Sequence, residues 1–183
     1  MSNISEEWVS LAPSASGRQL IQVPLPVLEA LANGDLECAN SLFPHDLTPY
    51  LISKECRGVW GMRRDQVTAD PADGIWVTRL LVDTATGVIL GRAGFHGPPD
   101  QVGMVEVGYA IDPLCRRQGH ARAALKILLE VAAGDSRVTI VRASVRPDNL
   151  ASRALIDQYG FCVVGEQWDD EDGLEVILQL SVR

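Results

Sequence analysis

The segment Met104–Val131, MVEVGYAIDPLCRRQGHARAALKILLEV, contains the pattern that decides the fold. Apolar residues alternate with small or polar ones as far as Ile111, which is typical of a strand. Pro113 then ends the strand, because proline cannot donate a hydrogen bond to a sheet. A basic turn follows at residues 116–121, and the alanine- and leucine-rich segment after it has the composition of a helix.

A strand, a tight basic turn and a helix together can bind phosphate groups. The first turn of a helix has N–H groups without intrahelical partners, and the helix dipole favours an anion there. Gly119 and Ala121 are small enough for a diphosphate to approach the backbone, and Arg116, Arg117 and Arg122 add positive charge. An ordinary arginine-flanked helix start has the same pattern, so the rest of the chain has to decide between the two interpretations.

The composition indicates one globular domain of 183 residues. We expect a flexible tail at residues 1–17 and a single domain at 18–183. The net charge of −8 argues against general binding of nucleic acid or anionic membranes. No run approaches the roughly 18 apolar residues of a membrane span, and no signal peptide is recognisable, so we expect a cytoplasmic protein. The cysteines are scattered, and neither a metal site nor a disulfide framework is indicated.

Periodicity and turn residues predict the remaining elements. Strands are expected at 18–23, 75–83, 88–95, 104–111, 138–145, 161–167 and 174–180, and helices at 26–33, within 36–54, at 55–69, after residue 121 as far as the turn at 134, and at 150–158. This order predicts an α/β fold (of the α+β type) with a central mixed, mostly antiparallel sheet flanked by helices.

Two motifs on these elements resemble those of the GNAT-type N-acetyltransferase superfamily. Arg116, Gly119 and Ala121 match its acetyl-CoA-binding pattern Arg/Gln-x-x-Gly-x-Gly/Ala. Asn149-x-x-Ser152, followed by Gly160-Phe161, is similar to a second segment of that superfamily, and the order of elements matches over about residues 18–181. The resemblance implies a GNAT-like single domain that uses acetyl-CoA as co-substrate.

The resemblance also implies which residues contact acetyl-CoA. The backbone at Tyr109, Ala110 and Ile111 would hold the acetyl-pantetheine arm, and Asn149 would lie near it. Contacts with the diphosphate carry over to Arg117, Gln118, Gly119, His120, Ala121 and Arg122. Asn149 has an equally good alternative role as a helix N-cap, where asparagine is favoured in any protein.

For catalysis, Glu106 is the candidate general base, as in relatives with a glutamate on this strand. Burial would raise its pKa, which suits a base that works near neutral pH. The alternative is an exposed position on an edge-like strand. The usual general-acid tyrosine, seven residues after Asn149, is replaced here by Ile156. Ser152 is the candidate acid instead, although it can equally be an ordinary first-turn helix residue.

Trp60-Gly61, Phe95-His96-Gly97 and Glu106-Val107-Gly108-Tyr109 are similar to the branch containing ribosomal-protein alanine N-acetyltransferases. This similarity suggests a primary amine as acceptor, either a protein N-terminus or a small molecule. Deprotonating an α-amine at pH 7 costs about 1.4 kcal/mol and a lysine about 4.6 kcal/mol, which favours the α-amine.

Weak candidates for acceptor contacts are His96, which is also an alternative proton acceptor, Asp100, and Trp168 beside the acidic loop 169–172. That loop is equally compatible with a solvated hairpin turn. A homodimer is compatible with the sequence but not indicated by it. The alternative function is an acyl-CoA-binding or sensing module with little or no turnover, because Ile156 occupies the usual acid position.

Overall fold

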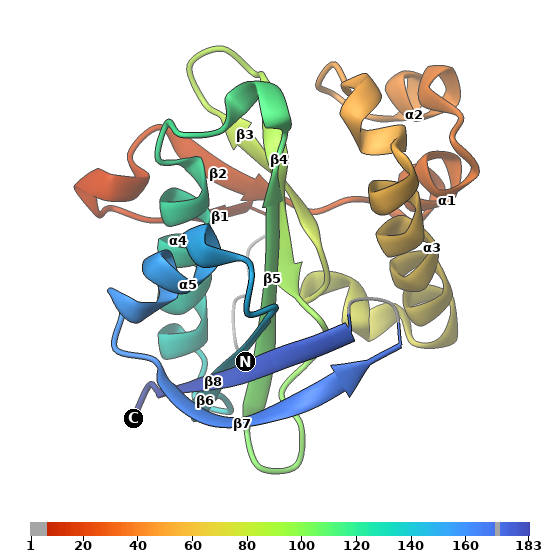
Figure 1. Ribbon diagram of the computed structural model, residues 1–183. Coiled ribbons are helices and arrows are strands. Elements are labelled where there is room, and N and C mark those ends of the chain that lie inside the picture. Colours follow the sequence, from red (N-terminus) through yellow and green to blue (C-terminus); the bar gives the residue numbers. More distant parts are fainter. Residues whose placement is uncertain (1–6, 171–172) are drawn as a thin grey trace.

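The structure, a computed structural model, describes residues 7–170 and 173–183. It contains one eight-stranded sheet in the order β1-β2-β3-β4-β5-β6-β8-β7 (Figure 1). The strands are β1 (Glu7–Val9), β2 (Arg18–Ile21), β3 (Arg79–Asp83), β4 (Ile89–Phe95), β5 (Met104–Ile111), β6 (Ile140–Val145), β7 (Cys162–Asp169) and β8 (Gly173–Ser181). The α-helices are α1 (Leu25–Asn33), α2 (Leu36–Leu42), α3 (Lys54–Ala69), α4 (His120–Gly134) and α5 (Leu150–Asp157). The predicted mixed, mostly antiparallel sheet is confirmed.

The sheet opens in its middle, between β5 and β6. These two strands form the one parallel pair among the described strands, and their pairing is limited to residues 104–106 with 140–142. On its other side, β5 stays paired with β4 as far as Ile111. The second half of β5 therefore has a strand neighbour on one side only.

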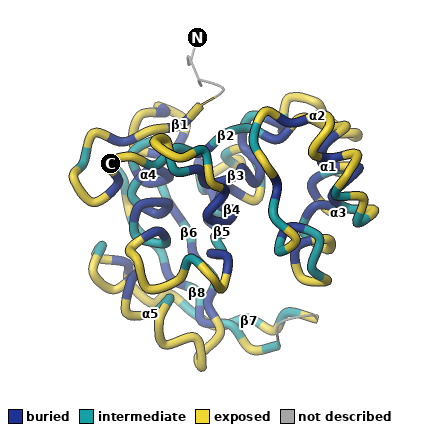
Figure 2. The backbone as a smooth tube through the Cα atoms, turned by 90° about the horizontal axis from the view of Figure 1, so that it is seen from above, coloured by how far each residue is buried: buried dark blue, intermediate teal, exposed yellow. Residues whose placement is uncertain are grey.

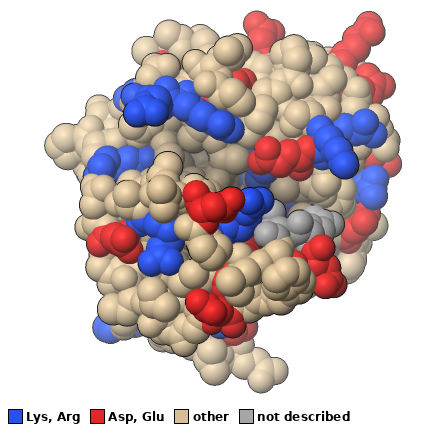
Figure 3. Space-filling view, viewed as in Figure 1, with Lys and Arg blue, Asp and Glu red and all other residues tan. Residues whose placement is uncertain are grey.

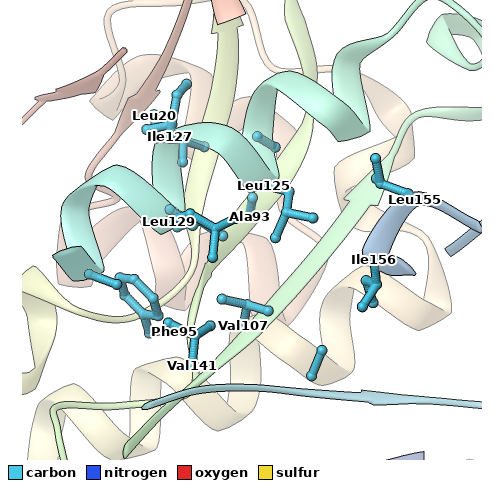
Figure 4. Close-up of a cluster of buried hydrophobic side chains, with 14 of the residues drawn as sticks. Leu20, Ala93, Phe95, Val107, Leu125, Ile127, Leu129, Val141, Leu155 and Ile156 are labelled. Carbon is cyan, nitrogen blue, oxygen red and sulfur yellow. The ribbon is translucent and has the colours of Figure 1, made fainter. Parts of the chain in front are cut away.

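One face of the sheet is covered by α4 and α5. The helix predicted from its composition is confirmed in α4, whose leucine and isoleucine side chains point onto the sheet and pack with Phe95, Val107 and Val141 (Figure 4). In α5, Leu155 and Ile156 belong to the same core, and Ile156 is only 1% exposed. The residue at the usual acid position is therefore a core residue.

The opposite face is covered by α1, α2 and α3, which form a second core around Trp60. Figure 2 shows these helices on one side of the strands and α4 with α5 on the other. Gly34 ends α1 with a left-handed backbone conformation, which glycine adopts readily. The result is three layers, with β5 and its opening in the middle one.

The expectation of a loose tail is wrong for residues 7–17; residues 1–6 lie outside the described residues. Strand β1 pairs with β2, and Trp8 is only 3% exposed. The Trp8 ring lies beneath the guanidinium of Arg79, 3.7 Å from its centre, and 5.5 Å from the ring of Phe95. Burial of a large aromatic ring together with a cation–π contact stabilises this short strand.

The expected strand at 75–83 begins later than predicted. Residues Pro71–Ile75 form a 3₁₀ helix, and pairing with β4 begins only at Arg79. Likewise, the strand expected from Val138 begins at Ile140. The other element boundaries differ from the prediction by one or two residues, as is common where helix and strand ends fray.

Candidate functional site

The opening beside β5 exposes backbone groups that have no strand partner there. In an antiparallel ladder, successive residues direct their N–H and C=O groups to opposite sides. His96 N–H donates to Glu106 O (2.8 Å) and Asp112 N–H to Leu90 O (3.0 Å), so even-numbered β5 residues face β4. Tyr109 and Ile111 consequently face the opening.

The same register directs the backbone of Ala110, the third residue expected to hold the pantetheine arm, toward its β4 partner Arg92. The carbonyl of Ile111 accepts a hydrogen bond from Arg116 Nε (3.1 Å). The backbone N–H groups of Tyr109 and Ile111 are thus the two donors that the register leaves for a bound molecule.

Helix α4 begins at this opening without a side-chain cap in the described structure. The starts of α2, α3 and α5, in contrast, are capped by Asp35, Ser53 and Asn149. The N-cap Gly119 has φ +82°, and a Cβ there would meet no atom within 4 Å. The first-turn N–H groups of α4 therefore remain available to an anion.

Arginine side chains surround this helix start. Figure 3 shows a hollow on this face, with Lys and Arg atoms above it, over the connection between β5 and α4. Arg117 and Gln118 are exposed, and Arg122 is partly buried. The side chain of His120 is buried, and this burial lowers its pKa. Of the predicted diphosphate contacts, His120 can therefore contribute only its backbone N–H.

On the α3 side of the sheet, Glu106 is held in a polar group. Ser144 Oγ donates to Glu106 Oε1 (2.7 Å), and His96 Nδ1 lies 3.8 Å from the same oxygen. The Glu106 side chain is 19% exposed. Ser144 thus holds the Glu106 carboxylate in place. Gln167 on β7 extends the group, with its amide 3.5 Å from Ser144 Oγ.

His96 is anchored through its backbone. Its N–H donates to Glu106 O, and its carbonyl accepts from Arg63 Nη1 (3.0 Å) and Gln66 Nε2 (3.1 Å), both on α3. Burial lowers the pKa of the His96 imidazole, and the nearby Arg63 and Arg92 act in the same direction, whereas Glu106 opposes them. The imidazole is therefore neutral at neutral pH.

On the α4 and α5 side, the Tyr109 hydroxyl lies 2.8 Å from Ser152 Oγ. Ser152 is positioned by Asn149, whose Oδ1 accepts from the Ser152 N–H (3.1 Å), so the N-cap role of Asn149 is confirmed. Burial raises the pKa of Tyr109, which keeps its hydroxyl protonated. Sequence reasoning missed this contact, since nothing in the spacing of the two residues predicts it.

The remaining candidates for acceptor contacts have different surroundings. Asp100 Oδ1 accepts from the N–H groups of Val102 and Met104, both at 2.9 Å, and so stabilises the turn before β5. Trp168 lies on β7 with 75% of its surface exposed. Part of the acidic loop beside it, residues 171–172, lies outside the described residues.

Two general features of the described part of the chain concern metals and membranes. Within residues 7–170 and 173–183, no three His, Cys, Asp or Glu side chains are arranged to hold a metal ion. None of the helices described is long and apolar enough to cross a membrane.

Known proteins share sequence and fold with this chain. The profile of the acetyltransferase (GNAT) domain matches residues 28–162. An 82-residue segment is 36% identical to the uncharacterized N-acetyltransferase YjdG of Bacillus subtilis (strain 168). That match covers 45% of this chain and 49% of YjdG, so the chain spans about half the length of this curated relative.

Solved structures resemble this fold over nearly its whole length. The ribosomal-protein-S5-alanine acetyltransferase from Vibrio fischeri has a TM-score of 0.63 at 16% identity, covering 91% of this chain and 93% of that one. Mycobacterium smegmatis RimJ, in complex with CoA-disulfide, has a TM-score of 0.63 at 18% identity, covering 90% and 81%. At these identities the likeness shows the fold alone.

Proposed function

Because this chain belongs to the GNAT acetyltransferase family, we propose that it transfers an acetyl group from acetyl-CoA directly to a primary amine. One observation carries this proposal: the opening between β5 and β6 connects an anion-binding helix start on one face of the sheet with a carboxylate–imidazole group on the other.

The residues at the opening fit acetyl-CoA. The uncapped first turn of α4 and the exposed Arg117 suit a diphosphate, and Gly119 keeps the approach to the backbone free of side chain. The thioester supplies the activated acetyl group. The N–H groups of Tyr109 and Ile111 are placed to donate to its carbonyl oxygen as negative charge develops there.

Proton transfer is divided between the two faces. The general base is built on Glu106, whose carboxylate is fixed by Ser144. On the other face, Ser152 protonates the departing thiolate, and Tyr109 holds the Ser152 hydroxyl in place. A thiol has an ordinary pKa of about 8.5, so the thiolate needs less help than an alkoxide would.

We propose a protein N-terminal amine or a small-molecule amine as the acceptor. The lower cost of deprotonating an α-amine supports this choice over a lysine side chain. His96 lies beside Glu106, the residue proposed for the general base. Asp100 stabilises its own turn, so it is a weaker candidate for a contact with the acceptor amine. The four free cysteines support a reducing, cytoplasmic location.

A second candidate function is acyl-CoA binding or sensing with little or no turnover. The burial of Ile156 in the core favours it, because this residue replaces the tyrosine that many relatives use as acid. The Tyr109–Ser152 contact is the feature that favours an enzyme instead.

A thiol-release assay tests these alternatives. Acetyl-CoA is incubated with the protein and a panel of N-terminal peptides, polyamines and small amines, and thermal unfolding is measured with and without acetyl-CoA. We expect release of CoA with at least one amine and a raised melting temperature. A raised melting temperature with no release across the panel would favour the sensing module, and an unchanged one would contradict both functions.

A further inference from the structure

The polar group around Glu106 contains a second titratable side chain that the proposed mechanism has not used. We propose that His96 and Glu106 act as a pair, in which His96 Nε2 accepts the proton of the attacking amine and Glu106 stabilises the resulting imidazolium. This inference rests on the proposed function. It assigns to His96 a catalytic role of its own.

The geometry places the two nitrogens of His96 in different surroundings. Nδ1 lies 3.8 Å from Glu106 Oε1, close enough for the carboxylate to stabilise a positive charge on the ring. Nε2 lies over the backbone of Gly108, beside the part of β5 that has no partner in β6. A proton on Nδ1, directed at the carboxylate, leaves the Nε2 lone pair free for the amine.

Gly108 makes room for this ring. A Cβ at that position would lie 2.9 Å from His96 Nε2, closer than real Cβ contacts. Gly108 is absent from the residues with positive φ, so its backbone conformation does not require glycine. A side chain at position 108 would therefore displace the imidazole from its place beside β5.

Protein atoms crowd the His96 ring closely enough to lower its pKa, yet half of its side-chain surface remains exposed, and its backbone is fixed. Arg63 and Gln66 donate to its carbonyl, and its N–H is bonded to the Glu106 carbonyl. Gln66 is itself bound to Asp73 Oδ2 (2.7 Å). A residue with a fixed backbone and a partly exposed ring is suited to contact a substrate.

Burial, together with two nearby arginines, keeps the ring neutral before the reaction. Arg63 from α3 and Arg92 from β4 lie near it, and Glu106 from β5 is the carboxylate that faces it. Burial and the two arginines lower the pKa of His96, so the ring is unprotonated at neutral pH. The adjacent carboxylate then stabilises the charge that appears on proton transfer.

Every proton in the proposed reaction is accounted for by the two substrates, the protein and water. As the amine nitrogen bonds to the acetyl carbon, its N–H bond breaks and the proton moves to His96 Nε2. The C–S bond breaks, and the thiolate takes a proton that is relayed from water through the Ser152 hydroxyl. Water also receives the proton on His96, so that the products are a neutral amide and a thiol.

The first experiment follows the His96 imidazole by NMR in the full-length protein. We expect Glu106→Gln to lower its pKa, because the carboxylate that favours the charged ring is removed. Glu130→Gln, on α4 and paired with Lys126, is the matched control and should leave the titration unchanged. An unmoved His96 titration in Glu106→Gln would overturn the pairing, even in a protein that acetylates nothing.

The second experiment measures turnover with an amine that the wild type acetylates. His96→Gln should lower kcat about 100-fold with unchanged affinity for acetyl-CoA, while His45→Gln, outside the site, should have no effect. Added imidazole should partly restore the kcat of His96→Ala. Gly108→Ala alone should lower kcat relative to the wild type. The same substitution added to His96→Ala should cause no further loss of kcat. An unchanged kcat in His96→Gln would overturn the catalytic role, whereas failure of the wild type with every amine would count against the proposed function.

Discussion

The two faces of the sheet at β5 are built in different ways. On the α4 face, the groups that suit a diphosphate lie next to one another in the chain, at residues 116–122. On the α3 face, Glu106 is completed by Ser144 from β6 and by His96, which follows β4 and is held by α3. The first arrangement depends on one local backbone conformation, and the second depends on the packing of several elements. Substitutions on the two faces should therefore fail in different ways.

The sharpest test of the α4 face is Gly119→Glu. The new side chain places negative charge at the diphosphate position and forces a non-glycine residue to φ +82°. Affinity for acetyl-CoA should fall at least about 100-fold, since juxtaposed like charges cost several kcal/mol. Isothermal calorimetry measures it, with Gly134→Glu at the exposed far end of α4 as the control. Normal affinity would remove the α4 turn from the site.

The corresponding test of the α3 face is Glu106→Gln, which keeps the shape of the side chain and removes its charge. Turnover should fall about 100-fold, within the range of lost general-base catalysis, while the Kd for acetyl-CoA stays the same. Glu130→Gln again serves as the control. A loss of acetyl-CoA affinity would show that the two faces are not separable.

A smaller effect is expected at the contact between Tyr109 and Ser152. Tyr109→Phe and Ser152→Ala should each lower kcat about tenfold, the equivalent of one hydrogen bond worth about 1.4 kcal/mol. The double variant should be no worse than the single ones, because the residues act as a unit. Tyr159→Phe is the control. Additive losses would mean that Tyr109 does not act through Ser152.

The smallest effect concerns stability. His120 is buried with a lowered pKa, so the unfolded chain binds its proton more readily. The unfolding free energy should be highest above pH 6.5 and fall as the pH drops toward the folded-state pKa. The difference between the unfolding free energies measured in urea at pH 7.5 and at pH 5.5 should be larger in the wild type than in His120→Gln. An equal pH dependence of the unfolding free energy in both proteins would show that His120 does not contribute to it. His45→Gln is the control.

The fold could be predicted to a large extent because its elements have clear periodicity. The alternation in β5 and the apolar spacing of α4 are local properties, and so is the cap at Asn149. Strand β1 could not be predicted, since three residues carry little periodicity and the burial of Trp8 depends on Arg79 and Phe95, far along the chain.

The site, like the fold, has a part that local sequence predicts and a part that depends on contacts between distant residues. The turn at Gly119 was visible in the sequence because its function requires a contiguous motif. The contacts of Glu106 with Ser144, and of Tyr109 with Ser152, arise from strand register and helix packing over separations of 38 and 43 residues. A single sequence holds the residues of such contacts but gives no measure of how strands align, so these pairs emerged only from the structure.

The short pairing between β5 and β6 also has a consequence for hydrogen exchange. Most amides in a central strand are protected from solvent deuterium by their neighbours. The amides of Tyr109 and Ile111 have no such neighbour past residue 106, so their protons should exchange rapidly in the middle of a stable sheet. Deuterium uptake at these two positions, slowed whenever a molecule occupies the opening, makes the strand a direct reporter of ligand occupancy.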